Sequence, residues 1–489
     1  MINVTTFLDA NACRLDKPVY YNIDRQVKYN SRQILGIISH LGRTFLQMNV
    51  EKSDRVLIYL DNGPEYLFSL LALWRIGAVA IPTNRIYTTS ELQYFIDDSQ
   101  AKLIITDKKI PELTINQYVI PVLDEYADSD ILEPANTAWD DLCQLQYTSG
   151  TTGKPKGAML THGNYFSAIQ NECDVLNMDH NSVMFCIYPM AHVGISWAIS
   201  ALRRAALLIT KNRYTFDEYL DIIYDNQVTH ATGMPPVIHS IVTNPDKVAN
   251  KLYSVESMIS GGGPLHREIW KKFYKKYGIP ILNAYGSSET IVIGTGTVIR
   301  PEDYAFADRF ESVGHPVCFS EVKIVDTENP KIELDTNNQG EIALRGPSIA
   351  LGYWNKPEAN QQTFLSDGWF LTGDVGYLDE DNRLFITDRK KDMIIMSGWK
   401  IYPTEVEEVL LAYEGVDEIA VFSLPHEHRG EIPVAAVIWN GEEDEGGLIK
   451  YASQHLARYK IPRKIFTTDQ LPRVNGWKLL RRQLREKYI

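Results

Sequence analysis

The run from Tyr147 to Gly157 combines the residue types that bind phosphate groups: glycines, hydroxyl side chains and two lysines. Glycine lets the backbone come close to an anion, and backbone N–H, hydroxyl and ammonium groups donate hydrogen bonds to its oxygens. The run is not a Walker A loop, because only two residues separate Gly150 from Gly153 and a proline follows Lys154. It therefore predicts a phosphate-binding loop that connects a strand to the next ordered segment, rather than a flexible surface loop.

Four further motifs with clustered polar or charged residues follow along the chain. They are NAYGSSET at 283–290, GWFLTGD at 368–374, DRKKD and SGWKIYPTE within 388–405, and PRVNGWKLLRR at 472–482. The first of them comes directly after a strand-like apolar segment, and open α/β sheets bind ligands at the carboxyl ends of their strands. The motif is therefore expected to face a ligand.

In this order, the five motifs resemble those of the AMP-forming adenylating enzymes, which are the acyl-CoA synthetases, the adenylation domains of peptide synthetases and firefly luciferase. The resemblance covers about Tyr29 to Arg485 and is closest to the carboxylic acid–CoA ligases. It implies a common set of residues that bind ATP or AMP. These are Thr148, Ser149, Gly150, Thr151, Thr152, Gly153, Lys154, Gly262, Asn283, Ala284, Tyr285, Gly286, Ser288, Asp374 and Arg389.

The resemblance also implies individual roles. It places Glu289 on Mg²⁺, makes Asp388 the hinge between domains, and lets pantetheine pass close to Gly398 in a thiol tunnel. Lys478 occupies the position of the catalytic lysine for adenylation. The motif departs from the family pattern at Trp477, since the family usually has glycine directly before the lysine, and the geometry of that loop is left open.

The acid pocket implied by the resemblance contains His192, Met234, Gly261 and Ser287. His192 is expected near the substrate carboxylate and is counted with Lys478 as catalytic. Amino-acid-activating relatives usually place an aspartate in this region to pair with the substrate ammonium. The histidine therefore favours a small acyl or aryl carboxylic acid over an α-amino acid, without specifying which acid.

The implied reaction uses ATP and Mg²⁺ to convert the acid to acyl-AMP with release of pyrophosphate, and then transfers the acyl group to CoA. One alternative is a stand-alone enzyme that loads an acyl or peptidyl carrier protein. The others are a luciferase-like oxygenase and a nucleotide-binding protein that has lost catalysis. Residues 458–487 are rich in lysine and arginine. They predict either a solvated face or a surface for an anionic acceptor such as CoA or an acidic carrier protein.

The elements that must position these motifs alternate between helix and strand in the first half of the chain. Apolar strands alternating with helices predict parallel sheets. Residues after Val313 read as shorter strands. We expect an α/β fold: a large N-terminal AMP-binding domain (residues 1–387) with mainly parallel, helix-covered sheets and a β-rich subdomain, and a small mobile α+β C-terminal domain (residues 388–489). The expected helices are Asn30–Met48, Pro64–Ile76 and Ser90–Asp98, and the expected strands are Arg55–Leu60, Ala78–Pro82 and Lys102–Thr106.

Bulk composition limits the other possibilities. A chain of 489 residues exceeds one ordinary core, so two or more domains are expected. The net charge of −13 argues against nonspecific nucleic-acid binding. The five cysteines are scattered without metal-ligand spacing, which favours a reduced, cytoplasmic setting. No secretory signal or integral membrane segment is expected, since the most apolar stretch is short and contains Arg75.

Overall fold

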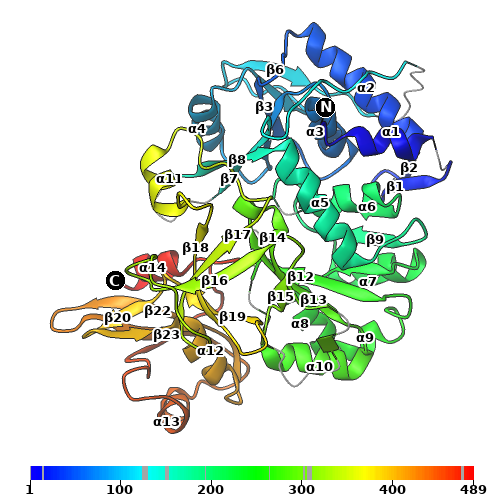
Figure 1. The fold of residues 1–489 in the computed structure, drawn as a ribbon. Helices are drawn as coiled ribbons and strands as arrows, with labels where there is room; N and C mark the ends of the chain where they lie inside the picture. Colours follow the sequence, from blue (N-terminus) through cyan, green and yellow to red (C-terminus); the bar gives the residue numbers. More distant parts are fainter. Residues whose placement is uncertain are drawn as a thin grey trace.

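The computed structural model describes residues 2–13, 16–123, 130–148, 154–192, 194–263, 265–300, 303–304, 311–474 and 478–489. Within these ranges the chain forms two large sheets, two smaller sheets and a two-stranded ribbon, with helices packed against them (Figure 1). The C-terminal segment, orange to red in Figure 1, lies beside the four-stranded sheet and away from the N-terminal helices.

The larger sheet has nine strands and is parallel through its middle, with antiparallel strands at both edges. In spatial order its strands are β15 (His315–Pro316), β14 (Val292–Val298), β13 (Ile281–Ser287), β12 (Ser257–Gly261), β11 (His230–Thr232), β9 (Val183–Cys186), β10 (Leu207–Thr210), β1 (Pro18–Asn22) and β2 (Val27–Asn30).

The second large sheet has six strands and is parallel except for its last pair. Its order is β6 (Asn116–Val119), β5 (Leu103–Thr106), β3 (Arg55–Tyr59), β4 (Val79–Thr83), β7 (Leu142–Thr148) and β8 (Lys156–Thr161). The helices that pack with the two sheets are α1 (Thr6–Ala12), α2 (Ser31–Gln47), α3 (Pro64–Arg75), α4 (Thr89–Ser99), α5 (His162–Leu176), α6 (Gly194–Arg203), α7 (Phe216–Asp225), α8 (Pro235–Thr243), α9 (Pro245–Val248) and α10 (Arg267–Tyr277).

Alternation along the buried strands divides the apolar side chains between two sides of each sheet. In β9, Met184 joins a core with α5 and α6, whereas its neighbour Phe185 joins a core with α7, α8 and α10. In β3, Val56 belongs to the same core as Met184, while Leu57 packs with α4. One apolar core therefore lies between the two large sheets and fixes them relative to each other.

The rest of the chain is richer in antiparallel strands. The expectation of shorter strands after Val313 is wrong, since Phe370–Leu378, Val416–His426 and Gly430–Trp439 are strands of 9, 11 and 10 residues. The four-stranded sheet consists, in order, of β16 (Glu321–Val325), β17 (Gly340–Arg345), β18 (Phe370–Leu378) and β19 (Leu384–Arg389). Helix α11 (Pro357–Thr363) contacts β18. The last sheet combines β20 (Ile394–Met396), β21 (Trp399–Ile401), β22 (Val416–His426), β23 (Gly430–Trp439) and β24 (Ile465–Thr467). The same region of the chain contains the helices α12 (Pro403–Leu411), α13 (Glu445–His455) and α14 (Arg481–Tyr488). It also contains the two-stranded ribbon of β25 (Arg473–Val474) and β26 (Lys478–Leu479).

The expected fold class is confirmed, and the expected elements differ from the observed ones by one or two residues. The expected helix at Asn30 begins one residue later because Asn30 is its N-cap: the side chain accepts from Gln33 N–H, and the Gln33 side chain accepts from Asn30 N–H. Among the described residues, no helix is long and apolar enough to cross a membrane.

One carboxyl group lies inside the core between the large sheets. Glu172 of α5 is fully buried, and Ser200 Oγ of α6 donates to its Oε2 at 2.7 Å. Burial raises the pKa of Glu172 to about 8. Between its ordinary value of 4.5 and about 8, the unfolded chain has lost this proton while the folded chain retains it. The free energy of unfolding therefore falls as pH rises through this window.

We predict that Glu172→Gln removes this fall, because the amide cannot ionise. Measured by urea denaturation, the stability advantage of the variant over the parent should grow by about 3 kcal/mol between pH 5 and pH 8. Glu51→Gln, at an exposed position, is the matched control and should show no such trend. An advantage that stays constant with pH would contradict the account of a buried neutral carboxyl.

Candidate active site

Segments rich in polar residues and glycine gather where the parallel strands β9, β11, β12 and β13 end. These strands are hydrogen-bonded side by side in one direction, so their carboxyl ends share one edge of the sheet. The edge carries Tyr188–His192 after β9, Met234 after β11, Gly261 and Gly262 at the end of β12, and Tyr285–Glu289 from β13 onward. The predicted acid-site residues and the predicted nucleotide residues of β12 and β13 thus share one edge of this sheet.

The next feature is a polar chain that joins this edge to the four-stranded sheet. The buried Tyr285 hydroxyl donates to Asp374 Oδ2 at 2.9 Å, and Arg389 Nε lies 3.4 Å from Asp374 Oδ1. Asp374 and Arg389 are cross-strand partners in β18 and β19. Burial, with the neighbouring Asp374 carboxylate, raises the pKa of Tyr285, so its phenol is a neutral donor. Three predicted nucleotide residues therefore form one connected group.

The turn after β13 is closely packed. A Cβ on Gly286 would lie 1.6 Å from the carbonyl oxygen of Val292, so only glycine fits there. Ser287 N–H donates to Thr290 Oγ1 at 2.9 Å, which closes the 3₁₀ turn η1 (Ser288–Thr290). Glu289 in this turn is nine-tenths buried, and its Oε1 accepts from the Tyr353 hydroxyl at 2.8 Å. Packing thus fixes the position of the Glu289 carboxylate.

The predicted phosphate loop connects β7 to β8, and its residues Ser149, Gly150, Thr151, Thr152 and Gly153 lie outside the described residues. Its two stems are described. Thr148 pairs with Lys156 across the strands, and both strands contact η1. The loop stems therefore lie beside Glu289, as the sequence prediction requires.

Side chains from other elements hold these stems. Tyr147 Oη donates to Asp98 Oδ2 at 2.7 Å, and Lys356 Nζ donates to Asp98 Oδ1 at 2.5 Å. Tyr94 Oη donates to the Pro155 carbonyl oxygen at 2.8 Å, and Lys154 Nζ lies 5.5 Å from the centre of the Tyr94 ring. Helix α4, which carries Asp98 and Tyr94, thereby anchors both ends of the loop.

The half-buried His192 lies on a turn held by two side-chain amides, of which Gln146 is buried and Asn62 half-buried. Gln146 Nε2 donates to the Ala191 carbonyl oxygen at 2.8 Å, and Asn62 Oδ1 accepts from Met190 N–H at 2.9 Å. The Tyr188 hydroxyl donates to the Gly261 carbonyl oxygen at 3.2 Å, which ties this turn to the end of β12. His192, Met234 and Gly261 therefore sit on adjacent segments of the shared edge.

The predicted hinge residue Asp388 is buried at the end of β19. Its two carboxylate oxygens accept from the backbone N–H groups of Arg389 at 2.6 Å and Thr404 at 2.9 Å. Burial raises the pKa of Asp388 to about 6, against the opposing effect of Arg481. Arg481 also forms a buried pair with Glu407 at 2.7 Å, so the start of α14 is anchored near the predicted hinge.

Gly398 and Lys478 lie in the C-terminal part. Ser397 and Gly398 have φ values of 52° and 85° and connect β20 to β21, as a tight hairpin turn with two left-handed residues requires. Backbone conformation, rather than crowding, accounts for this glycine, because nothing lies within 4 Å of its added Cβ. The backbone of Lys478 pairs with Val474 in the ribbon β25–β26. The Lys478 side chain and residues 475–477 lie outside the described part.

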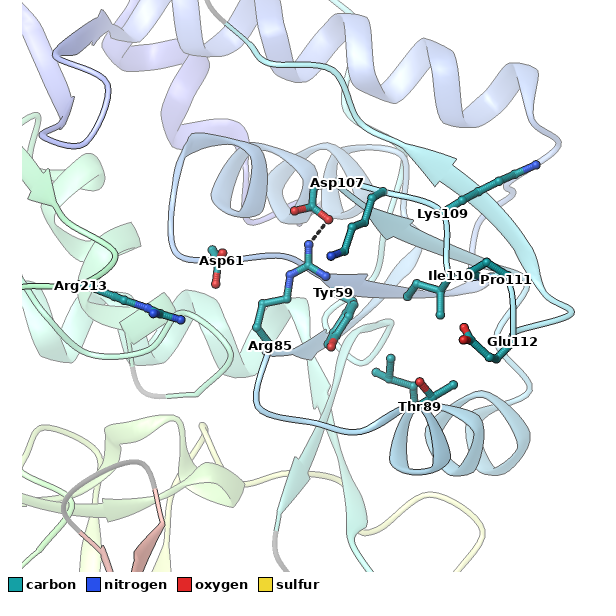
Figure 2. A pocket seen from close by; sticks show the side chains of 12 residues that line it. Tyr59, Asp61, Arg85, Thr89, Asp107, Lys109, Ile110, Pro111, Glu112 and Arg213 are labelled. Atoms are coloured by element: carbon teal, nitrogen blue, oxygen red, sulfur yellow. Dashed lines mark ion pairs between the residues drawn. The ribbon is translucent and has the colours of Figure 1, made fainter.

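A separate pocket of about 490 Å³ opens at the carboxyl ends of β3 and β5 (Figure 2). Arg85 forms an ion pair with Asp107 and lies 4.5 Å from the centre of the Tyr59 ring. Helix α4 separates this pocket from the phosphate-loop stems. The charges of the lining are mixed, so they favour no ligand of one sign. The lining residues are Tyr59, Asp61, Arg85, Thr89, Leu92, Asp107, Lys108, Lys109, Ile110, Pro111, Glu112 and Arg213.

Sequence reasoning missed several residues that hold the site. Gln144 and Gln146 both point inward in β7, with Gln144 Nε2 donating to Gln146 Oε1 at 2.8 Å. Two amides at alternate positions of an otherwise apolar strand are the signal that could have identified them. Asn62 and Tyr353 carry no comparable sequence signal, because their partners are distant in the chain.

Fold and site together define an α/β nucleotide-binding enzyme with its site at the edge of a sheet. The comparisons agree: a family described as AMP-binding enzyme matches residues 7–354, and its C-terminal domain family matches residues 405–476. The 4-coumarate–CoA ligase 4 of Arabidopsis thaliana is 31% identical over 498 residues, covering 94% of this chain and 85% of that protein.

Two solved structures are similar over almost their whole length. ATP-bound MatB from Rhodopseudomonas palustris has a TM-score of 0.91 at 27% identity, covering 100% of this chain and 99% of that chain. The o-succinylbenzoate CoA synthetase MenE from Bacillus subtilis, in complex with ATP and magnesium, has a TM-score of 0.86 at 28% identity, covering 98% of both chains. This chain belongs to the AMP-binding enzyme family. The predicted family and the predicted chemistry, AMP-forming acid–CoA ligation, are confirmed.

We predict that Gly286→Ala destroys the turn after β13, because the new Cβ would overlap the Val292 carbonyl group. Binding of adenine nucleotide, measured by calorimetry, should weaken more than about tenfold, together with a lower unfolding midpoint. The control is Gly446→Ala in α13, where the nearest atom to the new Cβ is 4.0 Å away and nucleotide binding should stay unchanged. Normal binding by Gly286→Ala would contradict the packing argument.

Proposed function

We propose that this protein activates a small acyl or aryl carboxylic acid at the edge formed by β9, β11, β12 and β13. A carboxylate oxygen of the acid attacks the α-phosphorus of ATP, pyrophosphate leaves, and the acyl-AMP then passes its acyl group to the thiol of CoA with release of AMP. The observation that carries the proposal is the meeting at one edge of the His192 turn, the Tyr285–Asp374–Arg389 chain, and Glu289 beside the phosphate-loop stems.

The adenosine half of ATP is assigned to the Tyr285 chain. Tyr285 lies near adenine, Asp374 accepts from both ribose hydroxyls, and Arg389 supports that carboxylate. Their mutual bonds of 2.9 and 3.4 Å support the assignment, since they orient Asp374 before the nucleotide arrives. Asn283, Ala284, Gly286 and Gly262 contribute the surrounding backbone. A ribose bound here places the α-phosphate toward Ser288.

The phosphate half is assigned to the loop 148–154, with Ser288 on the α-phosphate. Glu289 is a suitable residue for Mg²⁺, since Mg²⁺ in phosphate-transfer sites is often held by one or two carboxylates together with substrate phosphates. The described residues support this fit: Glu289 is fixed beside the loop stems, and no cluster of three His, Cys, Asp or Glu side chains offers a metal site elsewhere among them. Bound there, the ion would neutralise phosphate charge.

Lys478 is proposed to neutralise the other side of the reacting centre, between the substrate carboxylate and the α-phosphate. Rotation of the C-terminal domain about Asp388 then withdraws Lys478 and admits the thiol along Gly398. Two steps with different requirements thus use two faces of residues 388–489. The departure at Trp477 concerns only the loop that presents the lysine.

We predict that Lys478→Ala reduces acyl-AMP formation by about 100-fold or more, because the two reacting anions lose their shared cation. Thioester formation from a supplied acyl-adenylate should be largely retained. Quenched assays follow the two steps separately: pyrophosphate release reports acyl-AMP formation, and acyl-CoA reports thioester formation. Arg482→Ala, four positions further on and exposed, is the control and should keep both rates. Equal loss of both steps in Lys478→Ala would contradict the division of labour.

The class of acid is argued from the turn that carries His192. Residues 187–194 contain no acidic side chain that could pair with a substrate ammonium. Met234, Gly261 and Ser287 lie on or directly after the adjacent strand ends, so they would offer the acid an apolar side chain, backbone and one hydroxyl. A carboxylic acid without an α-amino group fits this lining best, which agrees with the coumarate and succinylbenzoate in the names of the relatives.

The proposal is tested by offering the protein a library of carboxylic acids with ATP and Mg²⁺. Pyrophosphate release is followed first with CoA and then with holo-carrier protein. We expect acid-dependent pyrophosphate release and acyl-CoA formation. If only the carrier protein is acylated, the acceptor is the carrier protein and not CoA. If no acid causes release of pyrophosphate, the proposed reaction is wrong.

The choice of CoA rests on the face beside Gly398. Trp399, which is 58% exposed, stacks on Tyr459 with ring centres 4.8 Å apart, and exposed aromatic rings bind nucleobases by stacking. Ser397 N–H donates to the Arg429 carbonyl oxygen at 3.0 Å, so that arginine adjoins the same turn. CoA carries an adenine nucleotide that a carrier-bound pantetheine lacks. An exposed aromatic platform therefore favours CoA.

Two arginines adjoin this platform: Arg458 precedes Tyr459 in the chain, and Arg429 adjoins the turn before Trp399. Arg463 donates to the Arg458 carbonyl oxygen at 3.2 Å, and burial together with the charges of Arg429 and Arg458 lowers the pKa of Arg463. Like charges held close together are favourable only when an anion can join them, and guanidinium groups suit phosphates. Several other basic residues of 458–487 form ion pairs, for example Arg473 with Glu418 and Arg485 with Glu431. Arg429, Arg458 and Arg463 form no ion pair with the described carboxylates, and this arginine cluster is the part assigned to CoA phosphates.

We predict that Arg458→Glu and Arg463→Glu each raise KM for CoA about fivefold to tenfold while leaving KM for ATP unchanged, because only the acceptor loses a phosphate partner. Steady-state kinetics at two salt concentrations provide the measurement, with a weaker effect at high salt. Lys450→Glu, an exposed charge reversal on α13, is the matched control. An unchanged KM for CoA would remove these arginines from the acceptor site.

A further inference from the structure

The segment Gly352–Lys356 has no role in the reaction described above, yet it contacts strand β8, helix α4 and Glu289. Its backbone pairs with β8, as Met159 N–H donates to the Gly352 carbonyl oxygen and Trp354 N–H donates to the Gly157 carbonyl oxygen, each at 2.8 Å. It continues to α4, where Trp354 Nε1 donates to the Asp98 carbonyl oxygen at 3.2 Å. The segment thus acts as a brace across the loop stems.

Tyr353 at the centre of the brace reaches Glu289. Its hydroxyl donates to Glu289 Oε1 at 2.8 Å, and the two residues are 7% and 9% exposed. The other face of this contact is basic, since Lys156 Nζ lies 5.0 Å from the centre of the Tyr353 ring. One aromatic side chain therefore joins the carboxylate of the turn to a lysine of the phosphate-loop stem.

Tyr353 is itself held from both sides of its backbone. Asn360 Oδ1 accepts from Tyr353 N–H at 2.6 Å, and Asn360 Nδ2 donates to the Tyr353 carbonyl oxygen at 3.0 Å. The ring also packs edge-on against Phe364 with centres 5.3 Å apart. A hydroxyl fixed in this way has a single direction in which to donate, toward Glu289.

We propose that Tyr353 is a positioning residue that orients the Glu289 carboxylate for binding of Mg²⁺ with ATP. The inference rests on the proposed role of Glu289. By donating to Oε1, the phenol fixes the orientation of the Glu289 carboxylate, which would hold the ion. Groups that orient metal ligands in this way change metal affinity about 10- to 100-fold when they are removed.

The test is Tyr353→Phe, which keeps the ring, its packing and its neighbour Lys156 but removes the hydroxyl. Calorimetric titration with ATP should show about tenfold weaker binding in the presence of Mg²⁺ and unchanged binding in its absence, and the Mg²⁺ concentration for half-maximal pyrophosphate release should rise about tenfold. Tyr20→Phe is the matched control, because Tyr20 is fully buried and its hydroxyl bonds Thr210 Oγ1 at 2.7 Å away from the site. It should leave both quantities unchanged.

A merely structural role for Tyr353 would weaken ATP binding equally with and without Mg²⁺, and that result would overturn the inference, as would an unchanged Mg²⁺ dependence. Glu289→Gln, measured in the same way, separates this failure from failure of the proposed site. If Glu289→Gln weakens the Mg²⁺-dependent binding and Tyr353→Phe does not, only the positioning role is wrong. If neither variant changes it, Glu289 is not the Mg²⁺ ligand.

Discussion

The carboxylate of an acid and the phosphates of ATP repel each other, and the site must hold them in contact. At about 4 Å, two unit charges repel by about 4 kcal/mol at an effective dielectric constant of about 20. Donors and cations that are fixed before the reactants arrive offset this repulsion without reorganising during the reaction. Here the fixed groups lie at one edge of a parallel sheet and on the two stems of the loop between β7 and β8, where strand pairing leaves little freedom.

Ion pairs around Arg481 tie several C-terminal elements to one another. Arg481 pairs with Glu407 of α12 at 2.7 Å and lies 3.5 Å from Asp392, just beyond the proposed hinge. A buried guanidinium between two carboxylates is costly to separate. The ribbon that carries Lys478 and the helix α12 should therefore move together. The proposed rotation at Asp388 would then replace the face that carries Lys478 with the face that carries Gly398, while the contacts within residues 388–489 stay the same.

Much of this arrangement could be predicted from the sequence, because the motifs of the site are continuous runs and the strands that carry them alternate regularly with helices. Asp374 and Arg389 are examples, since each belongs to a recognisable motif and the two pair directly across β18 and β19. What could not be predicted is how the motifs are held. Gln146, Asn62 and Tyr353 act through partners far away in the chain, and such pairing is a property of packing that no local spacing reveals.

The brace at Gly352–Lys356 also sets an order of assembly during synthesis. Lys356 reaches back 258 residues to Asp98, and Tyr353 reaches Glu289, so the stems of the phosphate loop are completed only after about three-quarters of the chain has been made. Closing such long loops is slow compared with forming the local βα units, which can fold as they leave the ribosome. A nascent chain that ends before the brace can thus have its sheets in place and still be unable to use nucleotide as a stabilising ligand.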